Sequence, residues 1–245
     1  MQRLGFTRSK IRSNYTLHTP DAFVRAPLPG MQNATAIVHI SPHLGAKFTQ
    51  YTAELQAGGR LGTLPAGFSR FVYVHGGEVK LTLGTDQRTL KSASYACFPP
   101  GLSHDLHSDE PARMTVIEKP YMPLGEIPPP PFVIGNAAEV LVKPLPGEDR
   151  IDLQTLLPDH PAFDFAVNVM TYPPGVTLPF VEIHVMEHGL VMLQGEGVYL
   201  LNEDHHAVKA GDVIYMAPYC PQWFTSSNGV SGYLIYKDVN RHPHV

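Results

Sequence analysis

Three side chains that commonly bind metal ions lie close together in the stretch VEIHVMEHGL, residues 181–190. Glu182, His184 and His188 all fall on even positions, and residues of the same parity in an extended strand point to the same side. A strand here would direct one carboxylate and two imidazoles into a barrel interior. Burying such groups unpaired is unfavourable, and a bound cation removes that penalty. The stretch therefore favours a metal site over a hairpin with polar residues on its solvent face.

The elements that must position these side chains read as short strands. Apolar residues alternate in several runs, for example at Val198 and Leu200, and the runs are bounded by Gly, Pro, Asn or Asp. The 24 prolines and 21 glycines, spread among these runs, favour strands and turns over long helices. Only residues 150–159 support a short helical piece. Glu187 has the opposite parity to the three ligand candidates and is expected in solvent or in a turn. We predict an all-β protein built from antiparallel barrels.

A proline-rich stretch, KPYMPLGEIPPPPF, divides the chain near its middle. Such a stretch is stiff and extended and cannot sit inside a sheet, so it is expected to act as a linker. The same order of strands and turns precedes and follows it, which predicts duplicated domains. We predict an N-terminal barrel over residues 1–118, a linker over 119–132 and a C-terminal catalytic barrel over 133–245.

The two halves differ at the ligand positions. Aligning Gly76 with Gly195 brings His104 within one position of Gln222. The residues of the first half that align with the three ligand candidates do not form a convincing ligand set; they are Thr63, Pro65 and Ser69. The first barrel is therefore predicted to be metal-free and structural.

Composition narrows the possible partners. The formal net charge of −4 argues against a nucleic-acid partner, because phosphate-binding surfaces carry a basic excess. Cys97 and Cys220 are the only cysteines, too few for a disulfide scaffold, which favours a reducing compartment. The N-terminal residues resemble no secretory signal, and no apolar run is long enough to span a bilayer. We expect a soluble, cytoplasmic protein without a membrane partner. Apolar strand faces outside a barrel favour a homo-oligomer.

The ligand cluster resembles the metal-binding motif of the cupin barrel, in a permuted form. Glu182 stands at the first histidine position of that motif and His188 at its glutamate position. In the second cupin motif, Gln222 stands where a histidine is usual. The resemblance implies a bicupin, two tandem cupin barrels of the double-stranded β-helix, jelly-roll-like type, and a metal held by Glu182, His184, His188 and Gln222.

This Glu/His/His/Gln set is similar to that of the (S)-ureidoglycine aminohydrolase family, bicupins of the allantoin pathway. The segments EIHVMEHG, GEGVYLL, AGDVIYMAPYCPQWF and YLIYKDVNR carry the likeness. It implies hydrolysis of (S)-ureidoglycine to (S)-ureidoglycolate and ammonia in purine catabolism, by a manganese enzyme acting on a C–N bond. From the ligand types alone, Mn(II), Fe(II), Ni(II) and Zn(II) are all suitable.

A ureido substrate with a carboxylate needs a cation and hydrogen-bond donors. Tyr233 and Lys237 share one parity in the stretch GYLIYKDV, so a single strand could present both inward. Lys237 is predicted to bind the substrate carboxylate, and Tyr233 and Tyr199 to donate hydrogen bonds. Glu182 is predicted to act both as a metal ligand and as a proton shuttle. Substrate contacts are thus expected from Glu182, Tyr199, Gln222, Tyr233 and Lys237, with Glu182, Lys237 and Tyr233 catalytic.

One residue departs from the family pattern, and two other functions stay open. Asn168 stands where a pocket histidine is expected in this family, and an amide cannot shuttle a proton. Two histidines and a carboxylate also describe a non-haem iron site, which would make the chain a cupin oxygenase. A closed coordination shell would instead suit a non-catalytic, metal-containing cupin that binds a small molecule.

Overall fold

The structure, a computed structural model, describes residues 6–238 of the chain. Its elements are β-strands and short 3-10 helices, the latter at Pro20–Ala22, Pro42–Leu44 and Ala137–Glu139. The predicted all-β class is confirmed. The stretch that was expected to be helical, residues 150–159, instead belongs largely to a strand, β13 (Glu148–Thr155). None of the helices among residues 6–238 is long and apolar enough to cross a membrane.

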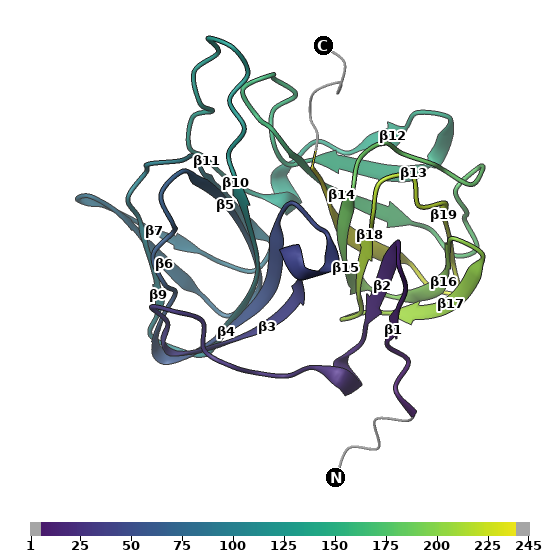
Figure 1. Cartoon of the computed structure of the whole chain (residues 1–245), viewed down its shortest axis with the longest axis horizontal. Helices are drawn as coiled ribbons and strands as arrows, with labels where there is room; N and C mark the ends of the chain where they lie inside the picture. The colour runs from purple at the N-terminus through teal and green to yellow at the C-terminus, as the bar shows by residue number, and fades with distance from the viewer. Residues whose placement is uncertain (1–5, 239–245) are drawn as a thin grey trace. The chain divides into compact units, whose positions relative to one another are not determined.

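The chain folds into two compact units. One contains Val24–Glu139 and His160–Asp164 and is named the first barrel here; the other contains Met1–Phe23, Val140–Asp159 and Phe165–Val245 and is named the second barrel. Both are curled antiparallel β structures, as Figure 1 shows.

The first barrel is a nine-stranded sheet whose strands follow the order β11-β8-β5-β10-β4-β9-β6-β7, with β3 paired to β4. Its inward-facing residues form one apolar core that includes Val72, Val74 and Val116. The strands are β3 (Gln32–Ile40), β4 (Thr49–Arg60), β5 (Phe68–Gly76), β6 (Val79–Leu83), β7 (Asp86–Leu90), β8 (Ser94–Phe98), β9 (Asp105–Ser108), β10 (Ala112–Pro120) and β11 (Val133–Asn136).

The second barrel has an eight-stranded sheet, β1-β2-β18-β15-β20-β14-β13-β12, and a three-stranded sheet, β17-β16-β19. Side chains of both sheets meet in one core; Leu190 and Ile214 come from the first, and Leu201 and Phe224 from the second. Its strands are β1 (Lys10–Ile11), β2 (Tyr15–His18), β12 (Lys143–Leu145), β13, β14 (Ala166–Tyr172), β15 (His188–Gln194), β16 (Glu196–Leu201), β17 (Asp204–Lys209), β18 (Val213–Met216), β19 (Gln222–Ser226) and β20 (Ser231–Lys237).

The N-terminal segment belongs to the second barrel, which differs from the predicted boundaries 1–118, 119–132 and 133–245. Strand β2 pairs antiparallel with β18, in the register Ile214 opposite Leu17 (Figure 1). The reason is apolar burial: Tyr15 and Leu17 are almost completely buried in the core of that barrel. Burial of such side chains is favourable in proportion to the area removed from water. A segment early in the sequence therefore completes a sheet formed by the second half of the chain.

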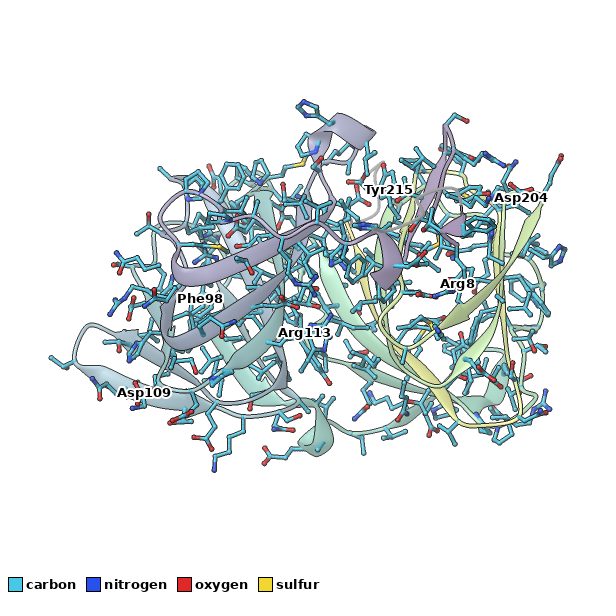
Figure 2. All side chains as sticks on the ribbon, turned by 90° about the horizontal axis from the view of Figure 1, so that it is seen from below. Arg8, Phe98, Asp109, Arg113, Asp204 and Tyr215 are labelled. Carbon is cyan, nitrogen blue, oxygen red and sulfur yellow. The ribbon has the colours of Figure 1, made fainter. Side chains whose placement is uncertain are left out.

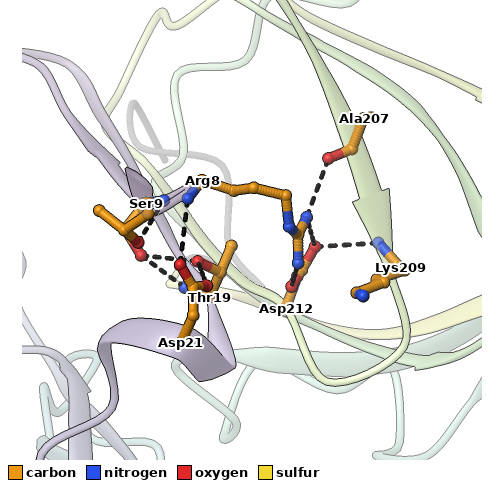
Figure 3. A network of polar contacts seen from close by, with 8 residues as sticks. Arg8, Ser9, Thr19, Asp21, Ala207, Lys209 and Asp212 are labelled. Atoms are coloured by element: carbon orange, nitrogen blue, oxygen red, sulfur yellow. Dashed lines mark hydrogen bonds and ion pairs between the residues drawn. The ribbon is translucent and has the colours of Figure 1, made fainter. Parts of the chain in front are cut away.

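An ion pair between the half-buried Arg8 and the buried Asp212 fixes this segment, as Figure 3 shows. The Arg8 guanidinium donates to both oxygens of Asp212, at 2.8 and 2.7 Å, and also to the Ala207 carbonyl at 3.1 Å. Asp212 has no solvent-exposed surface and accepts a further bond from the Lys209 backbone N–H at 2.9 Å. Two parallel charge-assisted bonds of this kind are among the strongest hydrogen bonds in proteins.

Replacing Arg8 by alanine is expected to lower the free energy of unfolding by about 2 kcal/mol, because the buried Asp212 carboxylate loses its charged partner. Urea denaturation measures the change. Arg12→Ala is the matched control: its pair with Asp204, at 3.4 Å, has both side chains about half exposed, and should contribute about 0.5 kcal/mol or less. Equal losses in the two variants would contradict the assignment.

The internal repeat is offset by one residue from the sequence alignment. Gly195 has φ +70°, and a Cβ there would lie 2.3 Å from the Val230 carbonyl oxygen. Gly77 has φ +78°, and its Cβ would lie 2.4 Å from the Pro111 carbonyl oxygen. Gly76 shows neither restriction. Gly77, not Gly76, therefore corresponds to Gly195, since only glycine tolerates this backbone conformation at so close an approach.

Candidate metal and substrate site

A cavity of about 280 Å³ lies in the second barrel. Every residue predicted from the sequence to bind metal or substrate lines it. These residues are Glu182, His184, His188, Tyr199, Gln222, Tyr233 and Lys237. Its remaining walls are Asn168 and mostly apolar side chains, Leu145, Pro146, Leu153, Met170, Met186 and Ile235. The tertiary structure thus brings together side chains that are more than fifty positions apart in the sequence.

The segment before β15 is held by backbone pairing with β19. Glu182 N donates to the Gln222 carbonyl at 2.8 Å, and Gln222 N donates to the Glu182 carbonyl at 2.9 Å. Further along, Tyr219 N donates to the His184 carbonyl at 2.6 Å. Glu182 and His184 lie outside any continuous strand, and β15 begins at His188. The predicted strand through all three is therefore wrong in its extent, although all three side chains do line the cavity.

The histidines and the carboxylate lie close to one another. The distance from His184 Nε2 to Glu182 Oε2 is 3.2 Å, and the ring centroids of His184 and His188 are 5.2 Å apart. Tyr199 donates its hydroxyl to Gln222 Oε1 at 3.4 Å. No three His, Cys, Asp or Glu side chains of residues 6–238 converge closely enough to form a metal cluster by themselves. The donors that line the cavity, two imidazoles with a carboxylate and an amide oxygen, nevertheless have the chemistry that a divalent cation requires.

His188 is arranged as a neutral imidazole with one free nitrogen. Its Nδ1–H donates to the Glu187 carbonyl at 2.9 Å, so Nε2 carries a lone pair. Burial, together with the charges of His184 and Lys237, lowers the pKa of His188 to about 3. A hydrogen bond that fixes the tautomer of a histidine in this way is typical of metal ligands.

Three tyrosines form a hydroxyl cluster beside the cavity. The hydroxyl oxygens of Tyr172 and Tyr233 are 2.5 Å apart, and both residues are buried. Burial raises the pKa of Tyr199 and of Tyr233 well above the ordinary value, so both hydroxyls stay protonated and can donate. Tyr172 was not identified from the sequence. Its parity with Asn168 and Met170 on β14 was the signal that could have found it.

Lys237 presents a cation to the cavity. It lies opposite His188 in the pairing of β20 with β15, and burial lowers its pKa, while Asp159 and Glu182 act in the opposite direction. Within residues 6–238, no carboxylate lies within salt-bridge distance of its ammonium. The last residues of the motif YLIYKDVNR, 239–241, lie outside the described residues.

Glu187 corrects a prediction. It was expected in solvent or in a turn, but it is only 1% exposed. Tyr215 of β18, labelled in Figure 2, donates its hydroxyl to Glu187 Oε2 at 3.0 Å. The Glu187 backbone N–H donates to Asp238 Oδ1 at 3.0 Å. As its opposite parity predicts, the Glu187 side chain points away from the cavity. It is hydrogen-bonded inside the protein, to Tyr215, instead of being exposed to water.

The first barrel has a different side chain at the position of His188. Glu118 of β10 lies opposite Arg70 of β5, just as Lys237 lies opposite His188 in the second barrel. Arg70, rather than Ser69, is therefore the counterpart of His188. The first barrel thus has the permanently charged guanidinium of Arg70 where the second barrel has His188, a potential metal ligand.

The Arg70 guanidinium has partners within its own barrel. It is 3% exposed and donates through Nε and Nη2 to Glu118 Oε1, at 2.8 and 2.6 Å. Its Nη1 donates to His104 Nε2 at 3.0 Å, and burial, followed by the charge of Arg70, lowers the pKa of His104 to about 4. A buried guanidinium disfavours a second cation at this position. That the first barrel is metal-free stays a prediction, which this ion pair supports.

Comparison with known proteins identifies relatives over almost the whole chain, although no family model matches it. The (S)-ureidoglycine aminohydrolase of Arabidopsis thaliana is 37% identical over 98% of this chain and 80% of its own length. The (S)-ureidoglycine aminohydrolase of Escherichia coli K12 is 31% identical over 93% of this chain and 89% of its own.

Solved structures show the same fold. The E. coli protein Ylba has a TM-score of 0.87 and 29% identity, with 99% of this chain and 98% of that chain covered. Oxalate decarboxylase of Bacillus subtilis, which has Mn(II) centres, has a TM-score of 0.69 and 11% identity over 95% of this chain and 79% of that chain. At that identity the likeness concerns the fold alone. Together these structures confirm the predicted cupin fold.

Proposed function

The chain belongs to the (S)-ureidoglycine aminohydrolase family, and we propose that it catalyses this hydrolysis at the cavity of the second barrel with the help of a bound metal. The observation that carries the proposal is the gathering of Glu182, His184, His188, Gln222 and Lys237 on one cavity. The proposed reaction is that of the family, and the cavity is lined by side chains that could bind the metal, transfer protons and bind the substrate.

The reaction exchanges an amine for a hydroxyl at one carbon. A C–O bond forms to the oxygen of water and the C–N bond to the amine breaks, giving (S)-ureidoglycolate and ammonia. The water must lose a proton, and the leaving amine must gain one. A group that accepts the first proton and returns the second makes the exchange neutral overall.

Glu182 is the proposed proton carrier. Its carboxylate lines the cavity and lies 3.2 Å from His184 Nε2, so an imidazole adjoins the group that takes and returns the proton. Asn168 of β14, which lines the same cavity, cannot replace it because an amide does not titrate. Glu182 would thus combine proton transfer with metal binding.

Substrate orientation is assigned to Lys237 and the tyrosines. The Lys237 ammonium has no ion-pair partner within the described residues, which suits it to the substrate carboxylate. Tyr233 contacts Tyr172 and can donate to the carboxylate or to the ureido oxygen when Tyr172 is the donor of that pair. Tyr199 donates its one proton to Gln222, so it would donate to the substrate only after releasing that bond. Fixed donors position a substrate without a further loss of side-chain entropy.

Glu182, His184, His188 and Gln222 would hold the metal, which we propose to be manganese. When bound, it would polarise the substrate and lower the pKa of water. The nitrogen and oxygen donors also suit iron, nickel or zinc, so the choice of manganese follows the family resemblance. Assembly into a homo-oligomer stays a prediction.

Ammonia release from freshly generated (S)-ureidoglycine tests the proposal. Metal-free protein is assayed with and without added Mn(II), and Mn(II)-dependent release above the spontaneous rate is expected. Protein that releases no ammonia with Mn(II) or Fe(II), yet consumes oxygen when loaded with iron, would be an oxygenase. Bound metal with neither activity would indicate a binding protein.

A further inference from the structure

Tyr172 of β14 carries a hydroxyl at a position where an aromatic ring alone would satisfy the packing. The residue is 0% exposed and lies in the core of the second barrel, with its ring edge-on to that of Phe224 at a centroid distance of 4.8 Å. It is not among the described residues that line the cavity. Burying a hydroxyl without a hydrogen bond is unfavourable, so the role of this group depends on its partner.

That partner is Tyr233 of the neighbouring strand β20. Tyr172 lies opposite Ser231, and Tyr233 lies opposite Met170. The two tyrosines are therefore diagonal neighbours on one face of the sheet, a separation that aromatic side chains can span. Their hydroxyl oxygens are 2.5 Å apart. Among residues 6–238, the Tyr172 hydroxyl has no other hydrogen-bond partner, so it can influence the cavity only through Tyr233.

Burial fixes the direction of this hydrogen bond. Each tyrosine hydroxyl has one proton to donate and can also accept. If Tyr233 donated to Tyr172, the Tyr172 proton would be enclosed in the core with neither a protein acceptor among residues 6–238 nor access to water, and an unsatisfied buried donor is costly. Donation from Tyr172 to Tyr233 removes this cost. Tyr233 lines the cavity, and its own proton remains available to an acceptor other than Tyr172.

The neighbouring Tyr199 is consistent with the same direction. Its proton is donated to Gln222 Oε1 at 3.4 Å, so its hydroxyl can accept from Tyr233, with which it also interacts. Donation thus runs from Tyr172 to Tyr233 and from there to Tyr199 or to a bound substrate. A substrate oxygen can replace the Tyr199 oxygen as the acceptor without any change at Tyr172.

We propose that Tyr172 is a positioning residue: by donating to Tyr233, it directs the Tyr233 hydroxyl to act as a hydrogen-bond donor to an oxygen of the substrate. This inference rests on the proposed function and deepens it, because it explains how one substrate contact is oriented. The bond from Tyr172 also polarises the Tyr233 hydroxyl and strengthens it as a donor, since hydrogen bonds in a chain reinforce one another.

A double-mutant cycle tests the coupling of the two hydroxyls. Ammonia release from (S)-ureidoglycine is measured with the full-length, Mn(II)-loaded protein for wild type, Tyr172→Phe, Tyr233→Phe and the double variant. Phenylalanine keeps both rings, and circular dichroism and metal content check that fold and site are intact. Tyr15→Phe is the matched control, because Tyr15 is buried in the same core while its hydroxyl bonds to Asp204. Its kinetics should equal those of wild type.

Tyr233→Phe should lower kcat/KM by about tenfold or more, the loss typical of a hydrogen bond to a charged group. Tyr172→Phe should lower it by about fivefold, mainly through KM, because Tyr233 keeps its proton but loses the donor that orients it. The double variant should match Tyr233→Phe, because Tyr172 acts only through that hydroxyl.

In an active enzyme, two results overturn the role of Tyr172 alone. One is a wild-type kcat/KM in either single variant. The other is a loss from Tyr172→Phe that persists undiminished in the Tyr233→Phe background, is confined to kcat or is explained by lost metal, because Tyr172 would then be a core residue without a positioning role. A wild type that releases no ammonia overturns the proposed function, and the inference with it.

Discussion

Replacement of His188 by alanine is expected to remove the bound metal and, with it, almost all ammonia release. His188 is 2% exposed, its Nδ1–H is committed to the Glu187 carbonyl, and its low pKa keeps the imidazole neutral. A neutral imidazole with its Nε2 lone pair free is the form that binds metals. Loss of several kcal/mol of transition-state stabilisation by the metal corresponds to a decrease of at least about a thousandfold in kcat/KM.

Metal content and turnover are measured on the same folded preparation, with circular dichroism as the test of folding. His205→Ala is the matched control, because His205 is an exposed histidine on β17 of the same barrel, and its loss should change neither quantity. A folded His188→Ala protein that retains a full equivalent of metal and more than about a tenth of the wild-type turnover would contradict the ligand assignment.

Replacement of Glu182 by glutamine should lower kcat by about 10²–10⁴-fold, the range typical of a lost general acid–base group. The amide has the shape of the carboxylate and keeps an oxygen toward the cavity, so the decrease should exceed any loss of metal. The backbone hydrogen bonds between residue 182 and Gln222 do not involve the Glu182 side chain, so the segment before β15 should keep its position in the variant.

Steady-state kinetics and metal analysis distinguish this role from substrate binding. Lys237→Met provides the contrast: it removes the proposed partner of the substrate carboxylate and is expected to act mainly on KM. The proton-carrier role of Glu182 would be refuted by a Glu182→Gln protein with bound metal and undiminished kcat. A decrease fully explained by metal loss would leave Glu182 as a ligand only.

Much of the site could be predicted because residue types and the alternation of side chains along a strand can be read from short segments of sequence. Alternation with a period of two places Tyr233 and Lys237 on the same side of β20 whatever the rest of the fold does. Charged and polar types in an otherwise apolar strand then identify the functional face. The prediction for Glu187 failed for a related reason: parity gives the side of a strand, but not whether that side meets solvent or another part of the protein.

The sequence by itself determined the all-β class and the polar side chains that line the cavity, some from residue type and parity and others, such as Gln222, from the family resemblance. Only the tertiary structure decided which distant segments complete each sheet. Strand β2 joins β18 because Tyr15 and Leu17 bury apolar surface there, and no local pattern specifies that partner. The contact of Tyr172 with Tyr233 and the unpartnered oxygen of Asn168 likewise arise from packing between strands that are far apart in the chain. Such contacts depend on the register of the whole sheet, which is set by the burial of all its strands together.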